Sequence, residues 1–218
     1  MTYLGNISLW IALFFCVLQF INSRNKKNNY LIKKNFLGPY GILIFSSISF
    51  CLLTYGHIIS DFSLVNVFQN SHTTKPLIYK ISGVWGNHEG SMLLWILVLS
   101  IFNYFIYRLY NKKNYIFIDK TLETQAIITF GFILFTVLTS NPFDKMLTIE
   151  TNGMGFNPIL QDPALAIHPP LLYIGYVGFS AAFSLSIGAL NLEKNSKTEW
   201  YIYMKPFVLA AWTFLTLG

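Results

Sequence analysis

The sequence predicts an all-α, polytopic integral membrane protein, a bundle of helices that cross a lipid bilayer. Hydrophobic residues make up 54% of the 218 residues and charged residues only 11%. A soluble domain carries about 25% charged residues. The apolar residues also gather in separate runs of about 20 residues, the length that a helix needs to cross about 30 Å of hydrocarbon. These observations exclude an ordinary soluble domain.

Five apolar runs predict complete spans, and a sixth begins before the sequence ends. The complete spans are expected at about 4–21, 40–60, 91–107, 121–140 and 169–190, and the partial one at 206–218. As a helix, residues 207–218 would rise only about 18 Å, which is short of a crossing. We therefore expect either a fragment of a longer protein or the product of a split gene whose partner chain completes the bundle.

The basic residues predict how the bundle faces. Twelve of the 15 lysine and arginine residues follow spans one, three and five. The two long loops, 61–90 and 141–168, hold only Lys75, Lys80 and Lys145. By the positive-inside rule, the N-terminus and both long loops lie outside. The net charge of +6 then belongs to the inner face, so we expect membrane lipid as a partner and no nucleic acid.

Both cysteines and two of the four histidines carry no expected site. Cys16 and Cys51 lie alone within spans, without the Cys-x-x-Cys pattern of a c-type cytochrome. Buried membrane cysteines usually act as small apolar residues. His57 stands at the end of a span and His72 in a hydrophilic loop, where a polar side chain needs no special role.

The first long loop ends in a glycine-rich block, Trp85-Gly-Asn-His-Glu-Gly-Ser91. Its glycines permit sharp turns and close backbone approach. No Gly-Lys-Ser/Thr follows, so this is not a phosphate-binding loop. One interpretation is a tight turn with Trp85 anchored at headgroup depth. The other is a ligand role for His88. Both stay open, and the residue chemistry favours the turn.

The second long loop leads into His168-Pro169-Pro170 at the start of the fifth span. Proline is tolerated in the first turn of a helix, so we expect His168 at a helix N-terminus, delivered by a short interfacial helix over 163–167. A neutral imidazole held on rigid backbone can ligate haem iron. It can equally be a capping residue. Tyr173, one turn further on, could border a flat apolar ligand.

Several sequence blocks, taken together, resemble the haem lyase subunit family of cytochrome c maturation, the CcmF and NrfE type. The blocks are residues 85–91 with 93–95, then 139–143, 157–162, 168–178 and 210–218. They follow the family's order along the whole chain. The resemblance implies that residues 1–218 are the N-terminal part of a larger multi-span membrane domain.

The resemblance also implies a function in cytochrome c-type biogenesis. Such a protein receives haem from a membrane-anchored haem chaperone and helps attach it covalently to apocytochrome c on the outer face, beside thiol-reducing maturation subunits. The histidine of the family's His-Pro-Pro motif is an axial ligand of that haem, and it matches His168. Pro169, Tyr173, Trp85 and His88 are expected neighbours. No catalytic acid or base is expected, because positioning alone contributes about 7–11 kcal/mol to such steps.

Departures from the family pattern limit what this chain does alone. The family's tryptophan-rich segment, its second external haem histidine and the histidine pair for a membrane b-type haem are absent from the sequence. We therefore expect the chain alone to be inactive as a haem lyase (cytochrome c synthetase) subunit and to need the C-terminal part or a split-gene partner. The abundance of Asn, Lys, Ile and Phe indicates an AT-rich genome, that of an alphaproteobacterium-like bacterium or of a mitochondrion. We expect a bacterial inner membrane, with the mitochondrial inner membrane as the alternative.

Two other classes of function stay open at this point. One is half of a membrane transporter or haem exporter, a class in which six-span halves are common. The spans lack the charged intramembrane residues of an ion path, which speaks against it. The other is a structural membrane subunit without a site of its own.

Overall fold

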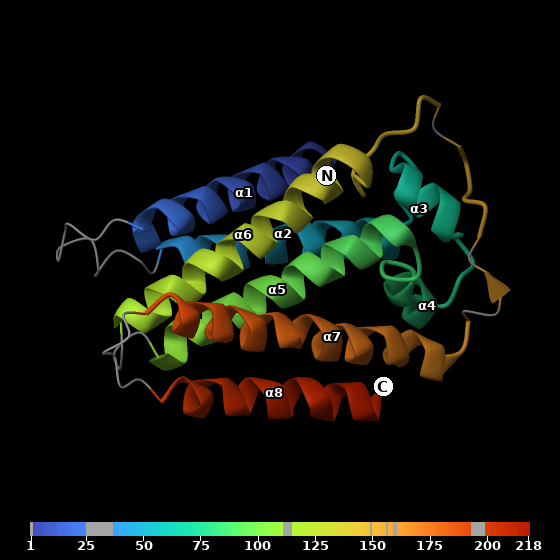
Figure 1. Cartoon of the computed structure of the whole chain (residues 1–218). Coiled ribbons are helices and arrows are strands. Elements are labelled where there is room, and N and C mark those ends of the chain that lie inside the picture. The colour runs from blue at the N-terminus through green and yellow to red at the C-terminus, as the bar shows by residue number, and fades with distance from the viewer. Residues whose placement is uncertain are drawn as a thin grey trace.

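The computed structural model describes residues 2–24, 37–110, 115–148, 150–155, 157–158, 161–192 and 199–218. Within these residues the regular structure is helical, apart from an isolated β-bridge between Leu64 and Lys145. Six long helices lie roughly along one direction, and two short helices gather at one end of them (Figure 1). The long helices are α1 Thr2–Arg24, α2 Leu37–Ile59, α5 His88–Tyr110, α6 Tyr115–Thr139, α7 Pro163–Leu190 and α8 Trp200–Leu217.

The predicted helical membrane fold is confirmed. Helices α1, α2, α5 and α6, together with residues 166–190 of α7, are long and apolar enough to cross a membrane. Most helices extend beyond the apolar runs of the sequence, because polar residues continue a helix past the hydrocarbon layer. The final run, expected from 206, lies within the 18-residue α8, which begins at Trp200.

The two ends of the bundle differ in what they carry (Figure 1). At one end lie the short helices α3 Val65–Asn70 and α4 Leu77–Ser82 together with the described residues of the segment 140–162. We call this the loop end. The other end carries Arg24 and Arg108 in the last turns of α1 and α5, and we call it the basic end. The C-terminal end of α8 lies at the loop end.

Two apolar clusters form the core. One joins α1 and α2 to the loop end, with Leu9, Ile42 and Leu64 fully buried. The other joins α5 to α8, with Phe117 and Val177 at its centre. Trp85 packs against both clusters. Trp85 is therefore one of the side chains, with Phe50 and Phe132, that connect the two halves of the core.

Close helix contact places α8 beside the first part of α7. A Cβ added to Gly175 would lie 2.5 Å from Cγ of Leu215, so only glycine permits this approach. Small residues at such contacts let membrane helices pack closely. Gly175 therefore lets the end of α8 lie next to the turn of α7 that carries His168.

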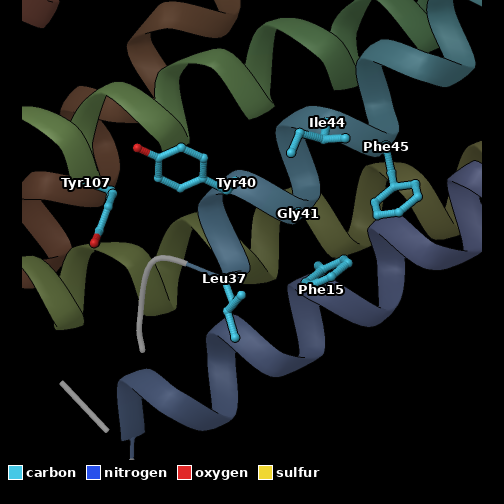
Figure 2. Close-up of a pocket in the computed structure, with 7 residues that line it drawn as sticks. All are labelled: Phe15, Leu37, Tyr40, Gly41, Ile44, Phe45 and Tyr107. Carbon is cyan, nitrogen blue, oxygen red and sulfur yellow. The ribbon is translucent and has the colours of Figure 1, made fainter. Parts of the chain in front are cut away.

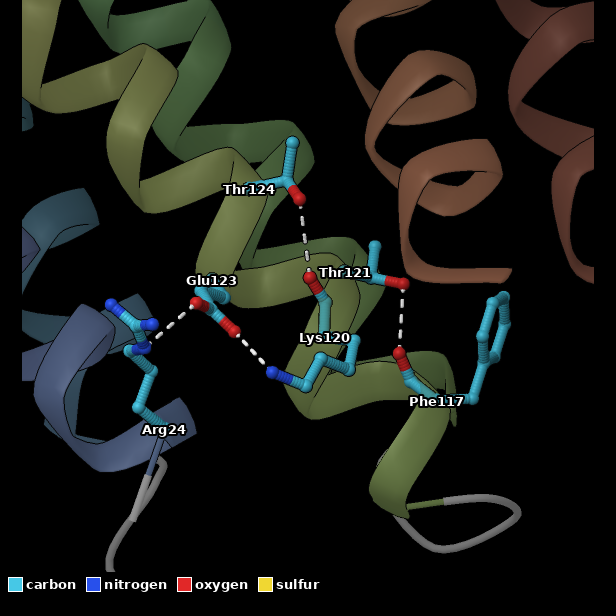
Figure 3. A network of polar contacts seen from close by, with 6 residues as sticks. All are labelled: Arg24, Phe117, Lys120, Thr121, Glu123 and Thr124. Atoms are coloured by element: carbon cyan, nitrogen blue, oxygen red, sulfur yellow. Dashed lines mark hydrogen bonds and ion pairs between the residues drawn. The ribbon is translucent and has the colours of Figure 1, made fainter. Parts of the chain in front are cut away.

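Polar contacts tie the helices together at the basic end (Figure 3). Glu123 of α6 accepts from Lys120 at 2.7 Å and pairs with Nε of Arg24 of α1 at 3.4 Å. Deeper in the bundle, the amide side chains of Gln19 and Asn103 exchange two hydrogen bonds of 2.8 and 2.9 Å. These contacts cross-link α1, α5 and α6.

Candidate functional site at the loop end

Helix α7 begins earlier than expected, at Pro163, so His168 lies in its second turn and not at its N-terminus. The expectations that the loop extends to residue 168 and that 163–167 forms a separate short helix are therefore wrong. Pro163 fits the first helical position because its missing N–H would have no partner there. The carboxylate of Asp162 caps the helix by accepting from the amide of Ala164 at 2.8 Å.

The proline pair leaves a buried carbonyl of α7 without its helical partner. In an α-helix the carbonyl of Ala166 would accept from the amide of residue 170, and Pro170 has none. Ala166 is only 5% exposed, so water does not replace that donor. Instead, the indole Nε1–H of Trp85 donates to the Ala166 oxygen at 2.9 Å. This contact joins the glycine-rich block to the His-Pro-Pro turn.

His168 is exposed, and its Nδ1 hydrogen-bonds to the backbone oxygen of Gly218 at the end of α8. A carbonyl oxygen only accepts, so in the neutral imidazole the proton lies on Nδ1. The lone pair then lies on Nε2, which has no hydrogen-bond partner within the described part of the chain. Ligating histidines usually have this arrangement, with one nitrogen held by an acceptor and the other on the metal.

The glycine-rich block is a turn whose shape is fixed by hydrogen bonds between its own side chains and its backbone. Asn87 caps α5 by accepting from the amide of Gly90 at 2.8 Å. The hydroxyl of Ser91 donates to the carbonyl of Trp85, also at 2.8 Å. A Cβ on Gly90 would lie 1.6 Å from the Val84 oxygen, so no other residue fits there. The turn interpretation of this block is the one that the geometry supports.

A buried polar cluster supports the turn from behind. Asn66 of α3 accepts from His57 Nε2 at 2.9 Å and donates to the side chains of Asn87 and Glu89 at 2.7 and 3.3 Å. His57 is fully buried. The expectation that it needs no special role was incomplete. No spacing in the sequence indicates this cluster, because its members come from α2, α3 and the start of α5 and meet only in the fold.

The other expected neighbours of His168 occupy different surroundings. His88 is exposed, and its Nε2 hydrogen-bonds to the hydroxyl of Ser140 at 2.9 Å, beyond the end of α6. Tyr173 lies edge-on against Trp95 of α5, with ring centroids 5.7 Å apart. Pro169 is half-buried. Of the expected neighbours outside α7, Trp85 is thus the one that is hydrogen-bonded to the turn of His168.

A groove lies elsewhere, near the start of α2 (Figure 2). It is apolar, has a volume of about 580 Å³, and is lined by Phe15, Leu37, Tyr40, Gly41, Ile44, Phe45 and Tyr107. It contains no histidine and no carboxylate. Across the described ranges, no group of three or more His, Cys, Asp or Glu side chains is placed to hold a metal ion. The candidate ligand chemistry therefore centres on the single imidazole of His168.

Comparison with known proteins identifies the family. The model of the cytochrome C assembly protein family matches residues 85–218, beginning at Trp85. The chain belongs to this family. The cytochrome c-type biogenesis protein CycK of Rhizobium meliloti is 50% identical over 170 residues, which cover 78% of this chain and 25% of that protein. CcmF of Escherichia coli is 39% identical over 179 residues, covering 81% of this chain and 28% of its own length.

A solved structure agrees with this assignment at the level of the fold. A chain described as cytochrome c haem lyase CcmF superposes with a TM-score of 0.82 at 23% identity, covering 99% of this chain and 34% of that one. This chain therefore spans about a quarter to a third of the length of its relatives. The resemblance found in the sequence is confirmed, and the relatives' names support cytochrome c biogenesis rather than half of a transporter.

Proposed function

We propose that this chain forms part of the haem-handling site of a cytochrome c assembly protein, with His168 as one axial ligand of haem iron. In this proposal, haem arrives from a membrane-anchored chaperone and is attached covalently to apocytochrome c on the outer face. The observation that carries it is the exposed position of His168, whose Nδ1 is hydrogen-bonded to the backbone oxygen of Gly218 while Nε2 has no hydrogen-bond partner among the described residues. Membership of the family supports it.

The residues of the loop end fit haem as a ligand. Imidazole is a common axial ligand, and the chain supplies it on a helical turn rather than on a free loop. When bound, haem supplies the vinyl groups to which cysteine thiols add. This chain's own contribution is to hold the iron and thereby the orientation of the macrocycle, because positioning lowers a barrier without any proton donor. Pro169, Tyr173 and His88 are proposed as surrounding residues only.

The loop end is proposed to face outward and the basic end inward. Twelve of the 15 lysine and arginine residues lie in the segments that follow spans one, three and five, as the positive-inside rule requires of the inner face. A bacterial inner membrane fits this orientation, and the proposed site then meets an apocytochrome on the outer side. Thiol-reducing maturation subunits and the remainder of the family's haem site are the other proposed partners.

The decisive experiment compares variants of His168 in membranes that contain the complete open reading frame. His168→Ala should abolish retention of the external haem, seen as loss of its Soret absorption. His168→Cys, which still offers a ligand, should retain part of it with a shifted spectrum. His72→Ala is the matched control, because His72 is a half-buried histidine of the same end whose Nδ1 is hydrogen-bonded to Thr74. Full haem retention by His168→Ala would refute the proposal.

A further inference from the structure

We infer that Trp85 is a positioning residue for His168, acting through the carbonyl of Ala166 without touching the iron. The role of His168 rests on the proposed function, but the mechanical link between the two residues does not. The inference assigns a task to the Trp85–Ser91 block, for which the sequence alone indicated only a tight turn. Each step follows from contacts already described.

The first step is that the Ala166 carbonyl requires a donor from outside its own helix. Pro170 removes the amide that would normally reach it, and the proline ring also presses against this carbonyl four residues earlier. A buried carbonyl left without a partner costs free energy, so the turn would shift to satisfy it. The Trp85 indole removes that cost in one geometry only, with Nε1 at 2.9 Å from the oxygen. The hydrogen bond therefore selects one orientation of the turn.

The second step is that the indole is itself immobilised. The carbonyl of Trp85 accepts from the hydroxyl of Ser91, and its amide donates to the carbonyl of Ser82 at 3.2 Å. The indole ring packs against both apolar clusters of the core. Because both the backbone and the ring of Trp85 are held in place, its N–H determines where the Ala166 carbonyl lies. A donor on a freely rotating side chain would instead move with its acceptor.

The third step concerns direction around α7. Residues 166 and 168 are about 200° apart around a helix, so they point to nearly opposite sides. On the buried side Trp85 holds Ala166, and on the other side His168 contacts the Gly218 carbonyl of α8. Two contacts on opposite sides fix the rotation of the turn about the helix axis. Loss of the Trp85 contact leaves the imidazole held from one side only.

A haem-independent measurement tests the link. In haem-free membranes containing the complete open reading frame, the rate at which diethyl pyrocarbonate modifies His168 reports how firmly the imidazole is held. Trp85→Phe keeps an aromatic ring and removes the N–H. It should raise the rate about fivefold, as expected for the loss of one hydrogen bond. Trp95→Phe is the matched control, since Trp95 is also half-buried and makes ring contacts to Phe132 and Tyr173. Equal rates for the two variants would overturn the inference.

A rescue variant separates positioning from general loss of packing. Pro170→Ala restores an amide that can donate to the Ala166 carbonyl from within α7. In that background, Trp85→Phe should change the His168 modification rate less than twofold, because the carbonyl no longer needs the indole. If Trp85→Phe has the same effect in both backgrounds, the hydrogen bond is not the link and the inference fails.

Haem retention then connects the link to the proposed function. Trp85→Phe should weaken retention of external haem about tenfold, while Trp95→Phe leaves it within about twofold of the wild type. If His168→Ala retains haem in full, the proposed function fails, and the modification rates still decide whether Trp85 positions the turn. If His168→Ala loses haem but Trp85→Phe behaves like the wild type in every measurement, the inference fails and the proposed function stands.

Discussion

The loop end and the basic end of the bundle are held together by different chemistry. At the basic end, the ion pair between Arg24 and Glu123 joins α1 and α6, and the Arg24 side chain is 65% exposed. At the loop end, short amides, a glycine and backbone carbonyls form most of the contacts, and the acceptors at Ala166 and Asn66 belong to buried residues. Exposed ion pairs are screened and adjustable, whereas buried hydrogen bonds are directional.

The two ends are therefore expected to tolerate amino-acid substitutions to different degrees. The basic end keeps charged residues on one side of the membrane and allows their side chains to move. The loop end keeps the His-Pro-Pro turn in one orientation and has no spare contact at several positions. We therefore expect substitutions of similar size to have large effects at the loop end and small ones at the basic end.

The largest effect is expected from Gly90→Ala. The added Cβ would lie 1.6 Å from the Val84 oxygen, a backbone atom that cannot move aside without unfolding the turn. We expect a loss of at least about 3 kcal/mol in unfolding free energy and little accumulated protein, measured by thermal unfolding in detergent. Gly131→Ala is the control: a Cβ there meets no atom within 4 Å, and alanine favours a helix by about 1 kcal/mol. Equal behaviour of the two variants would contradict the comparison.

A smaller loss is expected from Asn87→Ala, which removes the cap of α5 and the partner of Asn66. Loss of a cap costs about 1 kcal/mol, and a buried amide left without its acceptor adds about 1–3 kcal/mol. Asn87→Asp keeps the oxygen that accepts from both Gly90 and Asn66 but loses the amide that donates to the Gly83 carbonyl at 2.7 Å, so it should recover most of the loss and not all of it. Chemical unfolding in detergent measures the stability of both variants. An alanine variant more stable than the aspartate variant would contradict this prediction.

The pH dependence of stability should report the buried lysine of the loop end. Burial, and secondarily the charge of Lys80, lowers the pKa of Lys75 from 10.5 to about 7. Between these values the unfolded chain binds more protons than the folded one, so stability should rise with pH by at most about 1.4 kcal/mol per unit. Lys75→Met should flatten this rise between pH 7 and 10, whereas Lys145→Met, at an exposed position, should preserve it. Thermal unfolding across this range measures both.

The smallest effect is expected at the basic end, from Glu123→Gln. The change removes the pair with Arg24 and with Lys120 but keeps the shape of the side chain. Pairs of this kind contribute about 0.2–1 kcal/mol. The unfolding free energy, measured by thermal unfolding, should therefore differ between wild type and variant by at most that amount at low salt and by less at high salt. A loss as large as that of Asn87→Ala would mean that the two ends do not differ in the way described.

Sequence reasoning reached the fold class and the family, because long apolar runs and ordered motif blocks are local signals, while the role of His168 stays a prediction. It missed the start of α7. The pair Pro169-Pro170 is typical of the first turn of a helix. In the structure, however, Asp162 caps the helix and Pro163 is its first residue, so α7 begins before His168. It also missed the contact between Trp85 and Ala166, which are 81 residues apart and meet through tertiary packing. A carbonyl released by a proline was the available clue.

In the proposed function, His168 at the loop end offers its Nε2 to haem on the outer side of the membrane. Labelling of His168→Cys with a membrane-impermeant maleimide in intact cells tests this claim most directly. We predict labelling from outside that added haemin prevents, because the thiol occupies the proposed ligand position. Labelling only after the membrane is permeabilised, or labelling that haemin leaves unchanged, would contradict the account.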